Sequence, residues 1–422
     1  MKITIGNTTY TKFASLSFDP QTDMSGAELV INQFSADIIT DDNITAGVSA
    51  YLYDDSDNLW AGYWLVEATR INTETVRIVA QSMMIALDKY TMAAKYYNGV
   101  NASVVISEIF SAVGVAYELE PTLANVQITG FCPAQTARQR LQWVVLVIGA
   151  YVQTYFTNKI IIRIVDTTET AIPKNRTYWK PSVTWGNLVT SVRVIAYSFS
   201  AGTPQTTDTW VTDGTTFYIV SSQEYVVTNP NVPSGTPENV VEIKDCMLVN
   251  SSNVASILSQ ISQYFFRNME VDLEAVDNGE YVPGDKVSGL VDDETLISGF
   301  IKSADFSFGL QSKAKLHIMQ TDSVEGGKLT ISSFYNNSLI NKAEYYLPVG
   351  YTYNIANPYY DQTVGSRRRV YYPLSEYVSG VIVSGGASAR VNYGVALEYQ
   401  NNILQVLSVD ELNESNNTVR IS

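Results

Sequence analysis

The sequence predicts a mainly β protein with a small α+β insert and a separate β domain at its C-terminal end. Short β-prone runs joined by polar turns fill residues 1–95. Apolar residues recur with a helical period only between 96 and 185 and once more over 252–268, and the last hundred or so residues show no helical period. A chain of 422 residues is long enough for two to four domains.

The first region, residues 1–95, has the pattern of a small antiparallel barrel. The polar segment from Asp54 to Asn58 lies between two β-prone runs and favours a hairpin. Several short strands joined by polar turns are typical of a closed or nearly closed barrel. The expected strands are 27–34, whose alternation is imperfect, and 48–53, 59–66 and 75–80.

The second region, residues 96–185, predicts a small α+β domain. A first helix is expected after Asn101 or Ser103, either of which can cap it, and Gly114 offers a stop. A second helix over 136–148 begins at Thr136, a plausible N-cap, and ends before Gly149. Two strands, 151–156 and 160–165, follow with a turn at 157–159.

The third region, residues 186–325, returns to strands and contains the predicted helix 252–268. Asp213-Gly214 between two β-prone runs is a strong hairpin signal. The segment 222–235, which contains two prolines, is expected to be a loop. Further strands are expected at 189–196, 269–276, 295–308 and 313–319.

The last region, residues 326–422, is rich in Tyr, Asn, Ser and Val and is predicted to be a β tip domain after the glycine-rich joint 325–327. Only 16% of the whole chain is charged, and tyrosine occurs 28 times. Such neutral surfaces suit permanent contacts between subunits, although tyrosine also stacks on sugars. The candidate interaction surface consists of Tyr345, Tyr346, Tyr351, Tyr353, Tyr359, Tyr360, Tyr371 and Tyr372.

The charge balance argues against nucleic-acid recognition as the main task. Asp and Glu number 42 against 27 Lys and Arg, which gives a net charge of −15 and repels phosphate backbones. The one compact basic run, 367–369, is interpreted as an exposed strand start. Cys132 and Cys246 are the only cysteines, so no disulfide framework is expected and assembly in a reducing cytoplasm fits. No stretch of roughly 18 apolar residues predicts a membrane span.

The chain lacks the residues on which most enzymes depend. His317 is the only histidine, and strand alternation places it on the same face as Lys313 and Lys315. No metal, nucleotide or serine-hydrolase motif is present. We therefore expect no catalytic, cofactor-binding or metal-binding residues and no cofactor. Paired carboxylates could serve a glycosidase, but the acidic clusters 41–42, 54–57 and 292–294 are interpreted as solvated turns.

Several segments, taken in order, resemble a known family. They are 34–39, 59–64, 79–82 and 87–88 in the first region, the helix 136–143 with the strand pair that follows Gly149, and YVPGDKV (281–287), 297–301 and 306–310 in the third region. This order is similar to that in baseplate hub and tail-tip hub proteins of phages and phage-like bacteriocins, the late control protein D-like hubs. The likeness covers residues 1–322 and concerns the order and character of elements.

The resemblance implies two tube-like β-barrels per chain and a homotrimeric virion protein. Three copies would adapt a hexameric tail tube to a threefold spike or tip, as in contractile injection systems, with DNA passing through the lumen without specific binding. The implied partners are other copies of the chain, the tail tube, distal tail or baseplate proteins, a spike or tip protein and the host cell surface. The implied location is the virion tail, with assembly in the host bacterial cytoplasm and roles in host attachment and genome ejection.

Two other functions are left open by the residues themselves. The tyrosine-rich stretch would also suit a receptor- or carbohydrate-binding tail protein. The acidic turns alone would support a cell-wall hydrolase, the weakest of the three hypotheses.

Overall fold

In the computed structural model, residues 1–320 are described except 187, 278, 291–295 and 309–311; beyond residue 320 only the backbone of short strands is described. The chain divides into two compact parts, one formed by residues 1–292 and 296–321 and the other by the rest. Strands dominate the first part, and four α-helices lie within its described residues. The predicted fold class, mainly β with an α+β insert, is confirmed.

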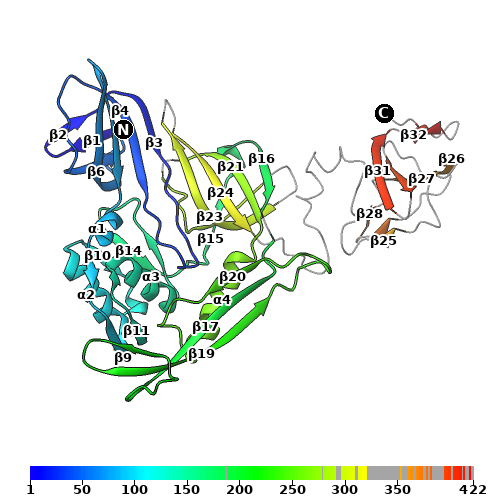
Figure 1. Ribbon diagram of the computed structural model, residues 1–422. Helices are drawn as coiled ribbons and strands as arrows, with labels where there is room; N and C mark the ends of the chain where they lie inside the picture. Colours follow the sequence, from blue (N-terminus) through cyan, green and yellow to red (C-terminus); the bar gives the residue numbers. More distant parts are fainter. Residues whose placement is uncertain are drawn as a thin grey trace. The chain divides into compact units, whose positions relative to one another are not determined.

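A first group of antiparallel strands forms a curved, open sheet, which we call the first repeat (Figure 1). Its strand order is β3-β4-β7-β6-β5-β1-β2. Alternate side chains are buried in β4 and β7, as the pleat requires for a sheet with one covered face. The strands are β1 (Lys2–Ile5), β2 (Thr8–Tyr10), β3 (Phe13–Phe18), β4 (Gln33–Ile39), β5 (Ser49–Tyr53), β6 (Leu59–Asn72) and β7 (Thr75–Gln81).

A second group of strands, the second repeat, lies beside the first and continues the same sheet (Figure 1). Its order is β16-β21-β24-β23-β22-β15, and β23 joins it to β3 of the first repeat. Both repeats contribute to one hydrophobic core. The strands are β15 (Glu169–Ile172), β16 (Thr177–Trp185), β21 (Met269–Val276), β22 (Lys286–Leu290), β23 (Leu296–Ser307) and β24 (Lys313–Gln320).

The two repeats have the same topology. The order β3-β4-β7-β6-β5-β1 matches β16-β21-β24-β23-β22-β15 strand for strand, although β1 pairs antiparallel to β5 and β15 pairs parallel to β22. The registers match as well: Leu65 lies opposite Ala80, and Ile301 lies opposite Ile318. Directly after these pairs, both long strands contain one extra residue, Val66 in β6 and Lys302 in β23. A shared bulge makes the residue equivalence unambiguous.

The α+β insert packs beneath the first repeat (Figure 1) around a second core. The helix that begins at Thr136 was predicted correctly: Thr136 Oγ1 accepts the Gln139 N–H, Gln139 Oε1 accepts the Thr136 N–H, and Gly149 ends the helix in a left-handed conformation. The elements are α1 (Met84–Asp88), β8 (Thr91–Met92), β9 (Lys95–Asn101), α2 (Ala102–Val113), β10 (Tyr117–Leu119), η1 (Pro121–Leu123), β11 (Gln127–Cys132), β12 (Gln135–Thr136), α3 (Ala137–Ile148), β13 (Tyr151–Gln153) and β14 (Ile160–Arg163). The short helix η2 (Lys174–Arg176) lies between β15 and β16 of the second repeat.

A four-stranded sheet and α4 are inserted between β16 and β21 of the second repeat. The predicted hairpin at Asp213-Gly214 is confirmed, but the prediction of a loop at 222–228 was wrong because β19 continues to Thr228, opposite Ser191. Trp210 and Phe217 form an exposed edge-to-face pair on this hairpin. The elements are β17 (Ser191–Ala201), β18 (Trp210–Thr212), β19 (Phe217–Thr228), β20 (Val240–Ile243) and α4 (Val254–Phe265), which lies inside the predicted range 252–268.

The predicted strand at 27–34 was wrong, because its backbone is bound by helix side chains instead of a neighbouring strand. The carbonyls of Ala27 and Leu29 accept hydrogen bonds from Gln142 and Arg138 of α3. Only from Gln33 onward does the chain enter β4. The connection between β3 and β4 is therefore fixed to the α+β insert.

The second part contains short strands whose side chains are not described. The basic run 367–369 forms the beginning of β27, so the predicted strand start at this run is confirmed. The strands are β25 (Thr352–Tyr353), β26 (Tyr360–Val364), β27 (Arg367–Pro373), β28 (Tyr377–Val378), β29 (Val381–Ile382), β30 (Gly394–Gln400), β31 (Ile403–Asp410), β32 (Leu412–Asn413) and β33 (Thr418–Val419). The predicted domain boundaries near 95, 185 and 325 stay predictions.

Candidate functional site

The two repeats meet at a junction between residues 18–22 and 302–306. Phe18 at the end of β3 pairs with Phe306 of β23, the Ala304 N–H donates to the Pro20 carbonyl at 3.0 Å, and the Thr22 N–H donates to the Lys302 carbonyl at 3.0 Å. These contacts continue the sheet across the junction as an antiparallel pair. One chain therefore holds two sheet repeats edge to edge.

An aromatic cluster fills the inner side of the junction. The rings of Phe18 and Phe306 stack with centroids 6.1 Å apart, and Trp60 meets Phe306 edge-on at 4.8 Å. Phe156, from the turn after β13, lies 5.0 Å from Trp60 and donates its backbone N–H to the Trp60 carbonyl. Aromatic pairs of this geometry stabilise a core beyond their buried area. The cluster ties both repeats and the α+β insert together.

Asp19 and Asp305 lie opposite each other across the junction. Their positions follow from the antiparallel pairing of Phe18 with Phe306. Burial raises the pKa of Asp19, a hydrogen bond from Ser17 opposes the increase, and the nearby Asp305 adds to it. The junction thus brings two like charges together within one chain.

The junction uses one edge of β3 and one edge in the second half of β23. The equivalent strands, β16 and β6, each leave the corresponding edge without a described partner strand. In the first repeat, the pairing of β6 with β5 runs from Leu59 to Trp64 and ends there. Within the described residues, the backbone of 67–72 pairs with β7 alone. In the second repeat, β16 pairs with β21, and no described strand covers its other side. Edges of this kind can pair with a further chain.

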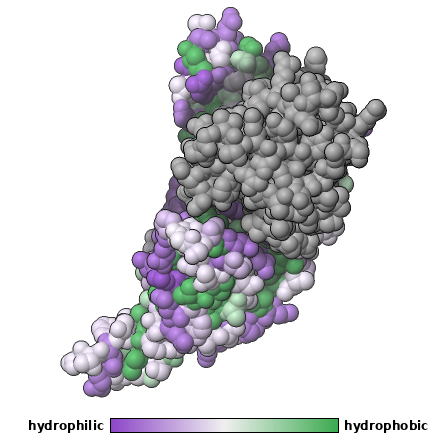
Figure 2. Space-filling model, turned by 90° about the vertical axis from the view of Figure 1, so that its right-hand side faces the viewer, coloured by the Kyte–Doolittle hydropathy of each residue, from purple (hydrophilic) through white to green (hydrophobic). Residues whose placement is uncertain are grey.

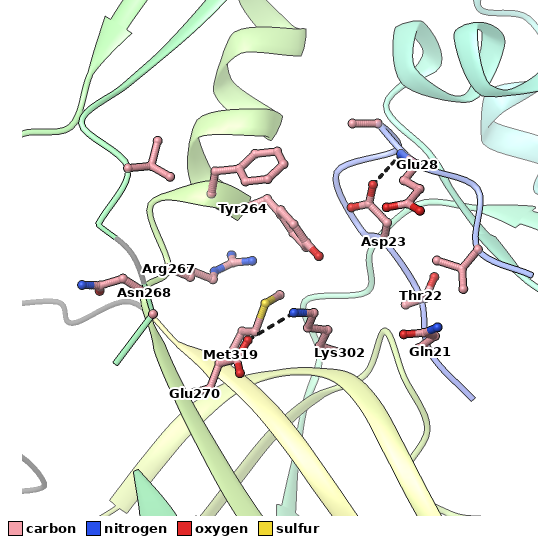
Figure 3. Close-up of a pocket in the computed structure, with 15 residues that line it drawn as sticks. Gln21, Thr22, Asp23, Glu28, Tyr264, Arg267, Asn268, Glu270, Lys302 and Met319 are labelled. Atoms are coloured by element: carbon pink, nitrogen blue, oxygen red, sulfur yellow. Dashed lines mark hydrogen bonds and ion pairs between the residues drawn. The ribbon is translucent and has the colours of Figure 1, made fainter. Parts of the chain in front are cut away.

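A groove with a volume of about 530 Å³ lies where α4 ends, beside the β3–β4 connection and the strands of the second repeat (Figure 3). Asp23 organises its far wall by accepting the Glu28 N–H at 2.6 Å and the Ser25 N–H at 2.8 Å. Lys302, the bulge residue of β23, forms an ion pair with Glu270 at 3.2 Å (Figure 3). The groove therefore presents charges of both signs.

A second recess, lined by Val165 and Phe300 among others, lies beside this groove, and two side chains at the end of α4 line both. Arg267 lies over the Phe300 ring at 4.5 Å, and burial lowers its pKa. Tyr264 lines both recesses, and burial, together with the Asp23 carboxylate, raises its pKa. Both residues act as packing groups between α4 and the second repeat.

His317 forms hydrogen bonds with two carboxylates that the sequence did not reveal. Its Nδ1 lies 2.6 Å from Asp272 of β21, and its Nε2 lies 3.0 Å from Asp305 of β23. Lys315 also pairs with Asp272 at 2.8 Å. The expected shared face of Lys313, Lys315 and His317 is confirmed by the burial of alternate residues in β24. The only local signal for this network was the polar alternation of the strand.

Where they are described, the acidic turns are held by hydrogen bonds from their own backbone and by cationic groups of neighbouring segments. Asp54 accepts the backbone N–H groups of Ser56 and Asn58, both at 2.8 Å. Burial raises the pKa of Asp54, but these bonds and the Asn58 side chain outweigh that and lower it. Arg70 donates to the carbonyls of residues 40–42, next to the 41–42 pair. The cluster 292–294 lies outside the described residues.

The remaining candidates from the sequence carry little chemistry in the structure. Cys132 and Cys246 are buried free thiols, and burial raises the pKa of Cys132 to about 12. Of the candidate tyrosines, Tyr345, Tyr346, Tyr351 and Tyr359 lie outside the described residues. For Tyr353, Tyr360, Tyr371 and Tyr372 only the backbone is described, in β25, β26 and β27.

The described residues contain neither a metal-binding group of side chains nor a membrane-spanning helix. No group of three or more His, Cys, Asp or Glu side chains is placed to hold a metal ion in the part of the chain that is described. Among the described helices, none has the length and apolar character needed to cross a membrane. On the face shown in Figure 2, outside the grey atoms, hydrophobic residues occur in small groups among hydrophilic ones.

Comparison with known proteins identifies the fold. No protein-family model matches the chain, and no curated protein matches it in sequence. Solved structures do match. A tail protein from Neisseria meningitidis MC58 is 11% identical, with a TM-score of 0.55 over 76% of this chain and 96% of that one.

A second match is the 43 kDa tail protein of prophage MuSo2 from Shewanella oneidensis. It is also 11% identical, with a TM-score of 0.53 over 76% of this chain and 98% of that one. The chain therefore shares the fold of phage tail proteins over about three quarters of its length, as the resemblance in the sequence implied.

Proposed function

We propose that this chain is a structural protein of a phage-type tail and forms a homotrimeric hub at the end of the tail tube. The observation that carries the proposal is the duplicated sheet. One chain holds two topologically equivalent repeats, joined edge to edge at Phe18 and Phe306. Three such chains in a ring would present six repeats, which is the number needed to stack on a hexameric tube.

The two faces of such a ring would differ in symmetry. The repeats match in strand order, but only the second carries a large insertion, β17–β20 with α4, between equivalent strands. In a ring of three chains, the six similar sheets would be arranged with nearly sixfold symmetry. The three insertions would be arranged with threefold symmetry. This is the geometry that adapts a hexameric tube to a threefold spike or tip.

The charge of the chain is compatible with a lumen that passes DNA. A net charge of −15 would disfavour binding of the phosphate backbone, so that the genome does not adhere to the wall. The neutral, tyrosine-rich part after residue 325 is then proposed to close the tube, to form a tip or to contact a partner such as the host cell surface. This role needs no catalytic side chain.

The experiment is to measure the mass of the purified full-length chain and to image it. Light scattering coupled to size-exclusion chromatography should give three times the monomer mass of 46.7 kDa. Electron-microscopy class averages should show a ring with six similar inner lobes. Antibody labelling of intact particles should place the chain at the distal end of the tail. A monomer that degrades cell-wall polysaccharide would overturn the proposal.

A further inference from the structure

The internal repeat contains information about how copies of the chain would contact each other. Within one chain, the end of β3 pairs with the second half of β23. The equivalent of β3 is β16, and the equivalent of β23 is β6. Every chain therefore carries a second pair of elements, the end of β16 and the second half of β6, equivalent to the two that form the junction.

These two equivalents do not meet within one chain. They belong to different repeats, with β16 at one end of the sheet path and β6 in the far half (Figure 1). In the described residues, 67–72 of β6 has a partner only on the β7 side, and β16 has a partner only on the β21 side. The intrachain edge is covered, with Ala304 fully buried, whereas the equivalent Ala68 is only partly buried.

We infer that β16 of one copy pairs antiparallel with residues 67–71 of β6 in the next copy, reproducing the intrachain junction between copies. This inference rests on the proposed hub function and names the strands that would hold the ring together. The bulges fix the register. Phe34 of β4 and Val271 of β21 are equivalent, because they lie opposite Ala80 and Ile318. Phe18 lies opposite Phe34 and Val183 lies opposite Val271, so Val183 is equivalent to Phe18.

The same registers fix the residues on the other strand. After the bulge, Glu67 lies opposite Val79 and Ser303 lies opposite His317, so Ala68 corresponds to Ala304 and Thr69 to Asp305. Since Asp19 faces Asp305 within the chain, Thr184 of one copy would face Thr69 of the next. The Ala68 N–H would then donate to the Trp185 carbonyl, as the Ala304 N–H does to Pro20.

The chemistry of the inferred contact suits an interface between separate copies. Thr184 and Thr69 are both exposed and uncharged, whereas the intrachain pair consists of two aspartates, and the Asp305 carboxylate contributes to the raised pKa of Asp19. Facing threonines are a favourable cross-strand pair. The contact uses different strands on its two sides, so it is heterologous and generates either a closed ring or an open filament.

The test is disulfide trapping in the full-length chain. Directly paired strand residues have Cα atoms at about 4.5–5.5 Å, within the range that a disulfide bridges. The Thr69→Cys/Thr184→Cys double variant should give covalent dimers and trimers, and no larger species, on non-reducing gels. An equimolar mixture of the two single variants should stop at dimers. Each single variant alone should stay uncrosslinked, since both native cysteines are buried.

Two further variants make the result interpretable. The Asp19→Cys/Asp305→Cys variant should form an intrachain disulfide at the equivalent place, which shows that the geometry permits the bond. The Thr8→Cys/Thr184→Cys variant tests pairing of β16 with β2, the terminal strand at the other end of the sheet. Crosslinking through Thr8 in place of Thr69 would overturn the inference.

Light scattering on the same samples separates the two levels of the argument. A trimer that crosslinks through Thr69 and Thr184 supports both the hub proposal and the inferred strands. A trimer that does not crosslink there, while the Asp19 and Asp305 control does, overturns the strand pairing and leaves the hub proposal standing. A chain that remains monomeric overturns both.

Discussion

Phe18 and Phe306 stack at 6.1 Å with their rings inclined by 21°, and their backbones are paired. Among the described strands, β3 and β23, which this pair joins, are the only two that connect the sheets of the two repeats. Both side chains are almost fully buried. The relationship joins two similar halves into one continuous sheet, and it supplies the pattern for a contact between copies.

Replacing Phe306 by alanine should strongly destabilise the first part of the chain. The ring contacts Phe18, Trp60 and Phe156, so its loss leaves a cavity in the aromatic cluster, at a cost of about 3–5 kcal/mol. Urea unfolding followed by tryptophan fluorescence measures this, because all six tryptophans of the chain precede residue 211. The matched control is Phe217→Ala on the exposed hairpin, which should cost less than about 1 kcal/mol. Equal losses would contradict the role of the junction.

Local elements of this fold were predictable from the sequence, but the repeat was not. The Thr136 helix and the hairpins depend on caps, turns and periodicity over a dozen residues, and these signals are local. The repeat, in contrast, preserves strand order and a bulge while equivalent residues differ, as Tyr63 and Gly299 do. Burial on one face of a sheet accepts many side chains, so no sequence periodicity marks the duplication.

The site was predictable only in outline, for the same reason. Phe18 and Phe306 are distant in sequence, and nothing near either residue indicates its partner. The His317 network likewise depends on the register of β24 between two strands that come from different segments. The segment 27–34 was mistaken for a strand because β-prone composition does not show that α3 side chains bind its backbone.

Thr136→Ala should cost about 1 kcal/mol of stability, since it removes the hydroxyl that accepts the Gln139 N–H, which is half of a reciprocal cap. Asn101→Ala is the matched control. Asn101 occupies the N-cap position of α2, but its side chain forms no capping hydrogen bond there. Urea midpoints of the two variants should therefore differ, and a larger loss for Asn101→Ala would contradict the assigned cap.

His317→Gln should lower stability by about 1 kcal/mol and leave assembly intact. The imidazole links Asp272 and Asp305 through contacts of 2.6 and 3.0 Å on a partly exposed face, where such pairs contribute modestly. A double-mutant cycle with Asp305→Asn measures the coupling. The oligomeric state by light scattering should match that of the wild type.

The same variant tests whether this histidine has any catalytic task. If the chain degraded purified cell walls and His317→Gln lost that activity while keeping its fold, the structural role assigned to the histidine would be wrong. Asp305→Asn is the control, because it breaks one contact of the histidine and leaves the imidazole in place.

Asp277 should make the protein less stable as the pH rises through the weakly acidic range. Its side chain exposes no surface, and burial raises its pKa to about 6 against the opposing effect of backbone N–H groups, including that of Glu280 at 2.7 Å. In the unfolded chain the same carboxyl has its ordinary pKa of 3.8. Between these two values the folded state holds a proton that the unfolded state has lost.

Because the folded state binds more protons in that interval, the contribution of Asp277 to the free energy of unfolding falls as the pH rises from about 4 to about 6. The whole change is at most roughly 3 kcal/mol, at about 1.4 kcal/mol per pKa unit. Asp277→Asn keeps an oxygen acceptor for the Glu280 N–H but cannot ionise, so its stability relative to wild type should increase across this interval. Urea midpoints at several pH values measure the difference, with exposed Asp245→Asn as the control that should follow the wild-type profile. Parallel profiles for wild type and Asp277→Asn would show that the buried carboxyl does not hold the proton.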